Sequence, residues 1–192
     1  MSLLTSIQDI SALTKLWQEI RDPIHVFVRL DNDELRVLDS PPVQRLRDIH
    51  QLAMSYLVYP GATHMRFEHS LGTMELAGRV FDTVTKPPSG VDSTVQEMFP
   101  QINDERQLSY WRRVIRIATL CHDIGHLPFS HAAEHELLPA GWDHEQLTVE
   151  FIRSPGMMKI WDSMRLGPLR AEDIAKLAVG QKKFRDGKLD AW

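Results

Sequence analysis

Histidines gather in one part of this 192-residue sequence: it contains nine, and five of them lie from His122 to His144. They include an adjacent pair, His122-Asp123, followed closely by Gly125. Two histidines and one carboxylate form a facial metal site that leaves coordination positions open. Neighbouring helical residues point about 100° apart, so such a pair shares an ion only where a helix ends. Because Gly125 lets the backbone turn, the pattern favours a divalent-metal site completed by a ligand from another helix.

The same residues also have other interpretations. His122 can cap the carbonyls at the end of a helix while Asp123 accepts a backbone N–H, with no metal involved. The segment from His131 to His135 also matches the H-x-x-E-H signature of inverted zinc metallopeptidases. That second interpretation leaves the His122-Asp123 pair and His69 without a role.

Other side chains suit phosphate chemistry. Arg66 carries a guanidinium that can fork onto phosphate oxygens. Histidine exchanges protons at neutral pH, since its ordinary pKa is about 6.5. Glu134 follows His131 by three residues, so on a helix the carboxylate can fix the tautomer of the imidazole. The alternatives are a solvated charge at Glu134, and an ion pair of Arg66 with Glu68 or a distant carboxylate.

Hydrophobic periodicity places these residues mainly on helices. The longest expected helices are 66–85 and 104–122, and Gly125 and Pro128 break the second just after the His-Asp pair. Shorter helices are expected at 32–38, 43–52, 130–138, 143–152 and 171–179, and the alternating segment 24–30 reads as one strand of a hairpin. The inward stripe expected for 104–122 is Leu108, Trp111, Ile115, Ala118 and Thr119. The sequence therefore predicts an all-α helical bundle with a small N-terminal β-hairpin.

Composition and charge narrow the class of protein. Hydrophobic residues at 43% and charged residues at 25% are ordinary for one globular domain. The net charge of −4 gives no indication of a nucleic-acid partner, which usually requires a basic face. The single cysteine fits a reducing compartment. There is no apolar run of spanning length and no signal-peptide pattern, so we expect a cytoplasmic protein without a membrane partner.

Several motifs, taken in order, resemble those of the HD-domain phosphohydrolases. The central ones are Arg66-Phe67-Glu68-His69-Ser70-Leu71-Gly72, His122-Asp123-Ile124-Gly125-His126 and Pro128-Phe129-Ser130-His131. The flanking ones are Asp22-Pro23-Ile24-His25, Gln44-Arg45-Leu46-Arg47, Tyr59-Pro60-Gly61-Ala62-Thr63-His64 and Trp142-Asp143-His144-Glu145-Gln146. Within that family the sequence is similar to the deoxynucleoside-triphosphate triphosphohydrolase branch, which includes dGTPase-like proteins. The resemblance implies an HD domain at 19–192, preceded by an N-terminal extension at 1–18.

The resemblance also implies a role for each matching residue. One divalent ion (Mn, Fe, Mg, Ni or Zn) is expected on His69, His122 and Asp123. Catalytic and phosphate-side roles fall on His126, His144 and the dyad of His131 and Glu134. Contacts to the α-phosphate fall on Arg66, and contacts to the deoxyribose on Gln51 and Leu52. The implied reaction converts a dNTP to a deoxynucleoside and triphosphate, in a homo-oligomer.

The sequence departs from the family pattern at several points. The family's fourth metal ligand is an aspartate in a downstream V-D-x-x-D-Y-x-x-R-D segment, which these 192 residues do not contain. We therefore expect an HD domain that is incomplete at its C-terminus, either an N-terminal portion or a naturally short member, with slow or undetectable turnover. The alternative is a catalytically weak or inactive nucleotide-binding or assembly module. Val26 stands where the family usually has glycine.

Comparison within the family separates related activities. Cyclic-dinucleotide phosphodiesterases typically carry lysine at the position of His126, and alarmone hydrolases carry an acidic pair after the His-Asp motif. Asp39 and Arg47 match positions that bind an activating guanine nucleotide in oligomeric members, whereas Gln18 and Glu19 do not match. The motifs therefore favour the triphosphohydrolase branch, without nucleotide activation.

Overall fold

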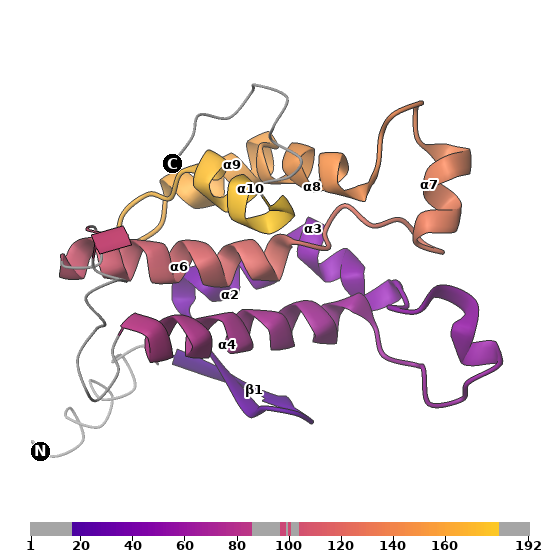
Figure 1. Ribbon diagram of the computed structural model, residues 1–192, viewed down its shortest axis with the longest axis horizontal. Helices are drawn as coiled ribbons and strands as arrows, with labels where there is room; N and C mark the ends of the chain where they lie inside the picture. Colours follow the sequence, from indigo (N-terminus) through magenta and orange to yellow (C-terminus); the bar gives the residue numbers. More distant parts are fainter. Residues whose placement is uncertain (1–16, 86–96, 99, 101–103, 181–192) are drawn as a thin grey trace, which may run out of the picture.

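The computed structural model describes residues 17–85, 97–98, 100 and 104–180 (Figure 1). Within these ranges helices predominate, and the only sheet is an antiparallel hairpin of β1 (Trp17–Asp22) and β2 (Val26–Asp31). The predicted all-α bundle with an N-terminal β-hairpin is therefore confirmed. Residues 1–16 of the expected extension and 181–192 of the expected domain lie outside the described residues. Among the described helices, none is both long enough and apolar enough to cross a membrane.

Two long helices position the residues singled out above. The helices α4 (Arg66–Thr85) and α6 (Glu105–Cys121) lie side by side, and α10 (Ala171–Val179) packs on another side of α6 (Figure 1). The N-cap of α6 is Asp104, whose carboxylate accepts the N–H of Arg106 at 2.8 Å. Its C-cap is His122, so the helix ends where the sequence indicated.

The buried face of α6 differs from the expected stripe. Of the five residues predicted to point inward, only Ala118 is fully buried; the other apolar positions of the core are Val114, Ile117, Leu120 and Cys121. The reason is that α6 has neighbours on two sides, α4 and α10, so its buried face is wider than one stripe. That face even includes two arginines, Arg113 and Arg116.

Several shorter helices follow the predicted bounds closely. The first, α2 (Asn32–Leu38), has a capping box in which Asp31 accepts the N–H of Glu34 and Glu34 accepts the N–H of Asp31. Later in the chain come α7 (His131–Leu137) and α8 (His144–Ile152). An unpredicted helix, α9 (Pro155–Asp162), begins after Ser154 with proline in its first turn. The Ser154-Pro155 pair is a local helix start signal, since proline is favoured in the first helical turn.

The predicted helix 43–52 is wrong. Instead α3 (Pro41–Gln44) gives way to two 3₁₀ turns, η1 (Arg45–Asp48) and η2 (Ala53–Leu57). Between them Ile49 is extended, and His50 forms an isolated bridge with Met65 just before α4. Pairing with a segment distant in sequence therefore replaces the local helix.

The hairpin turn holds a conformational outlier. Val26 has a φ of +69°, in the left-handed region that favours glycine, and its side chain is 63% exposed. The turn before it is held by Asp22, whose Oδ1 accepts the N–H groups of Ile24 and His25 at 2.9 and 2.7 Å. The position where the family usually has glycine is thus one whose backbone conformation favours glycine.

Candidate metal centre and histidine cluster

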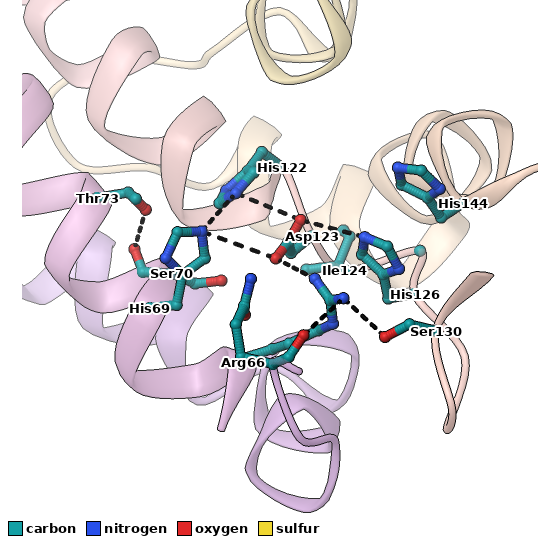
Figure 2. A network of polar contacts seen from close by, with 12 residues as sticks. Arg66, His69, Ser70, Thr73, His122, Asp123, Ile124, His126, Ser130 and His144 are labelled. Carbon is teal, nitrogen blue, oxygen red and sulfur yellow. Dashed lines mark hydrogen bonds and ion pairs between the residues drawn. The ribbon is translucent and has the colours of Figure 1, made fainter. Parts of the chain in front are cut away.

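The start of α4 and the end of α6 bring the first functional side chains together. Arg66 opens α4, where its N–H donates to the carbonyl of Ile49 at 2.8 Å. His69 lies three residues later on the same helix face. At the facing end of α6, His122 and Asp123 occupy the cap and the first residue beyond it (Figure 2).

His69, His122 and Asp123 form what we call the first triad. The two Nε2 atoms are 3.2 Å apart, and the Nε2 of His122 is 3.3 Å from Oδ1 of Asp123. The Nε2 of His69 lies 3.9 Å from Oδ2 of the same carboxylate. One donor atom from each residue lies within 4.8 Å of the others, so the three residues predicted as metal ligands converge. Two imidazoles and one carboxylate suit a divalent first-row metal.

The backbone of α6 orients His122 for that role. Its Nδ1 lies 2.6 Å from the carbonyl oxygen of Thr119, which can only accept a hydrogen bond. The ring proton is therefore on Nδ1, and the Nε2 lone pair faces the triad. His122 thus contacts a helix-end carbonyl with one ring nitrogen, as the capping interpretation predicts, and its other ring nitrogen faces His69 and Asp123.

Arg66 lies buried against the first triad. Its Nη1 donates to Oδ2 of Asp123 at 2.6 Å, and its Nη2 donates to Oγ of Ser130 at 2.8 Å. The distant carboxylate considered as a partner for Arg66 is thus Asp123. Burial is the largest influence on Asp123 and favours its protonated form, but His122 and Arg66 outweigh burial and lower the pKa of this carboxyl group.

A second group lies next to the first, and we call His126, Glu134 and His144 the second triad. They come from the loop after α6, from α7 and from the start of α8. Oε1 of Glu134 lies 3.0 Å from Nδ1 of His144 and 3.6 Å from Nδ1 of His126. His131 approaches the same oxygen at 3.1 Å through its Nδ1. The three histidines predicted on the phosphate side therefore surround one carboxylate oxygen of Glu134, the fourth predicted residue.

His126 is the most buried member of this cluster. The residue is 3% exposed, and its ring stacks on that of His144 with centroids 3.9 Å apart and an interplanar angle of 13°. Burial, reinforced by the positive charge of Arg66, lowers the pKa of His126 to about 3. The imidazole of His126 is therefore neutral at physiological pH.

Gly125 lets α8 approach the end of α6. A Cβ at this position would lie 1.9 Å from the carbonyl oxygen of His144 and 2.5 Å from the backbone N of Thr148. The N–H of Gly125 donates to Oγ1 of Thr148 at 3.0 Å, and that hydroxyl donates to the carbonyl of His122 at 3.2 Å. The sequence suggested that Gly125 allows a turn; the structure shows that it allows close packing, which brings His144 beside His126.

Sequence reasoning did not find the partners of these groups. Phe129 and Ser130 both have positive φ, 68° and 53°, directly before α7, and this turn places the hydroxyl of Ser130 on Arg66. Neither Ser130 nor the carbonyl of Thr119 carries a sequence signal for its contact, because both contacts depend on the packing of separate segments.

The remaining predicted residues lie in different surroundings. Gln51 contributes its backbone carbonyl, which accepts from Nη2 of Arg66 at 3.4 Å, and Leu52 is 48% exposed. Their expected roles at a deoxyribose stay predictions. His135 is exposed and belongs to neither triad, so the H-x-x-E-H interpretation has no convergent second histidine at that position.

Comparison with known proteins places these residues in a recognisable segment. A model described as the HD domain matches residues 66–178. Deoxynucleoside triphosphate triphosphohydrolase SAMHD1 of Bos taurus is 37% identical over 184 residues, covering 91% of this chain and 27% of that protein. The Homo sapiens protein of the same name is 37% identical over 164 residues, covering 81% and 24% respectively. An uncharacterized protein of Methanocaldococcus jannaschii is 41% identical over 126 residues, covering 66% and 22%. This chain thus spans about a quarter of the length of these relatives.

Proposed function

Because this chain belongs to the HD-domain family, we propose that it acts as a metal-dependent phosphohydrolase on nucleoside triphosphates. The observation that carries this proposal is the juxtaposition of two triads around Asp123, one suited to a metal and one suited to proton transfer. The Nε2 of His126 lies 3.5 Å from Oδ1 of Asp123, so the two groups meet at this carboxylate.

His69, His122 and Asp123 would hold the divalent ion. A bound divalent metal supplies Lewis acidity, polarising a phosphoryl oxygen and lowering the pKa of a coordinated water. The residues around it do the positioning. Thr119 fixes the His122 ring, and Arg66 holds the second oxygen of Asp123.

Arg66 is also the group proposed to bind a phosphate. Its Nε is buried and has no hydrogen-bond partner among the described residues. A buried charged donor without an acceptor is costly, and a phosphate oxygen would satisfy it with a charge-assisted hydrogen bond. Ser130 and Asp123 hold the guanidinium in place for that contact.

Proton transfer falls to His131 and Glu134. The Nδ1 of His131 lies 3.1 Å from Oε1 of Glu134, so the carboxylate can hold that proton and leave Nε2 for exchange with the substrate. The His131 side chain is 69% exposed, which leaves it open to a leaving group, whereas Glu134 is buried. His126 and His144 complete the polar wall facing the phosphates.

The finer part of the proposal concerns the substrate. The Bos taurus and Homo sapiens relatives are deoxynucleoside triphosphate triphosphohydrolases by name, so we propose attack at the α-phosphorus of a dNTP, releasing a deoxynucleoside and triphosphate. Gln51 and Leu52 are the proposed sugar contacts, and assembly into a homo-oligomer is the proposed quaternary state.

The test is product analysis of dGTP incubated with the 192-residue chain and Mn²⁺, Mg²⁺, Fe²⁺, Ni²⁺ or Zn²⁺. We expect slow release of deoxyguanosine and triphosphate, reduced about a hundredfold or more in His122→Gln. His135→Gln, an exposed histidine outside both triads, is the matched control and should retain the rate. Release of dGDP and phosphate, an unchanged rate in His122→Gln, or no release with any metal would overturn the proposed activity.

A further inference from the structure

We propose that the second triad, His126, Glu134 and His144, is itself a cation site that binds zinc. It is separate from the first triad in its ligands, although Asp123 lies between the two. One donor atom from each of the three residues lies within 4.8 Å of the others. Two imidazole nitrogens and one carboxylate oxygen are a frequent zinc ligand set, which leaves a fourth position for water or a further ligand.

The strongest support is the unpaired nitrogen of His126. Its Nδ1 is buried and has no hydrogen-bond partner among the described residues, although Oε1 of Glu134 lies 3.6 Å away. A buried polar atom without a partner costs free energy, so such atoms in native proteins usually have a partner. A cation between Nδ1 and the carboxylate would supply one.

The surroundings of the other ring nitrogen of His126, Nε2, fit this assignment. The Nε2 of His126 points toward Oδ1 of Asp123 at 3.5 Å. A ring proton on Nε2 faces that carboxylate and leaves the lone pair on Nδ1, where the second triad needs it. Carboxylates commonly orient metal-binding histidines in this way.

The other donors are placed by separate elements. His144 is the first residue of α8, and its Nδ1 lies 3.0 Å from Oε1 of Glu134 on α7. The parallel stacking of His126 and His144 directs both Nδ1 atoms toward the same oxygen. The Nδ1 of His131, 3.1 Å from that oxygen, is the nearest candidate for a fourth ligand.

Nitrogen donors select the kind of ion. Imidazole suits zinc, copper, iron and nickel, whereas magnesium and calcium prefer oxygen ligands. Zinc in the second triad would occupy the nitrogens and the carboxylate that proton transfer requires, so it would inhibit hydrolysis. That consequence rests on the proposed function, whereas zinc binding itself does not.

The test is zinc stoichiometry of the chelator-stripped 192-residue chain after equilibrium dialysis, measured by mass spectrometry. We expect two zinc ions per chain in the wild type, one for each triad, and one in His144→Gln. His122→Gln should also retain one ion, held by the second triad, and His135→Gln should retain both. Loss of the second site in His144→Gln, with the first intact, supports the assignment even where the chain hydrolyses nothing.

A spectroscopic readout guards against an unfolded variant. In His122→Gln the second triad is unaltered and should hold the remaining ion. X-ray absorption at the zinc edge of this variant should therefore show imidazole nitrogen and carboxylate oxygen ligands. Equal zinc content in the wild type and His144→Gln would overturn the proposal. So would a zinc-free His122→Gln chain that keeps the wild-type circular dichroism spectrum.

Discussion

Asp123 contacts members of both triads as well as Arg66. One of its oxygens accepts from Arg66, and the other faces His122 and His126. Replacing it would leave a buried guanidinium unpaired, which typically costs about 3–5 kcal/mol of stability. Histidine substitutions are therefore the sharper probes of metal binding, because they remove a ligand without removing the partner of Arg66.

Val26 is a β-branched residue in a left-handed backbone conformation, which is unfavourable for its side chain. A left-handed conformation costs a β-branched residue about 1–2 kcal/mol, and an exposed valine gains little packing in return. Glycine removes that strain but loses more chain entropy on folding, about 0.5–1 kcal/mol. We expect Val26→Gly to stabilise the protein by about 1 kcal/mol, or roughly 2–4 °C in thermal unfolding.

The matched control is Arg21→Gly, at an exposed position of the paired strand β1 without a left-handed backbone. There glycine only adds entropy to the unfolded chain, so the variant should lose about 0.5–1 kcal/mol. Differential scanning calorimetry of both variants decides the matter. An equal loss of stability at the two positions would show that Val26 is not strained.

At the scale of elements, the sequence predicts those helices whose ends are determined by local signals. The ends of α4 and α6 and the helices α8 and α10 follow from periodicity and caps such as Asp104 and Asp143, which act within one turn. The segment 43–52 could not be read this way, because His50 pairs with Met65 across the chain. The same holds at the site. Motifs identified the members of both triads, whereas the hold of Ser130 on Arg66 depends on tertiary packing.

The docking of α8 against the end of α6 depends on Gly125. A Cβ there would clash with the carbonyl oxygen of His144 and the backbone N of Thr148. Because both are backbone atoms, no rotamer change can relieve the clash, and α8 would have to move away from residue 125. We expect Gly125→Ala to destabilise the protein by about 3 kcal/mol or more. It should also weaken zinc binding at the second triad, because His144 moves with α8.

Gly156, in α9, is the control for that substitution. A Cβ there meets nothing within 4 Å, so Gly156→Ala should leave stability unchanged or raise it by up to about 1 kcal/mol. Urea unfolding of both variants measures the difference. Similar midpoints for the two would mean that α8 is not held as closely as the structure has it.

For the whole molecule, a buried charge cluster joins the hairpin to the long helices. Arg116 of α6 donates to both oxygens of Glu34 on α2, to Glu75 on α4, and to the carbonyl of Arg29 on β2. Burial opposes a charge here, but Glu34 and Glu75 outweigh burial and raise the pKa of Arg116. The ends of α4 and α6 that carry His69 and His122 thus belong to a framework that Arg116 holds together farther along the same two helices.

Removing one partner from that cluster should therefore affect the stability of the entire domain. Glu34→Gln keeps an acceptor for the N–H of Asp31 but leaves the Arg116 charge undercompensated, so we expect a loss of about 3 kcal/mol in urea unfolding. The control is Glu172→Gln, which breaks a bidentate pair with Arg153 whose side chains are 37–40% exposed. Exposed pairs contribute about 0–1 kcal/mol, and that contribution falls with salt. If both variants lost the same free energy, or if added salt abolished the effect of Glu34→Gln, the buried cluster would not be what holds the hairpin and α2 to the helices.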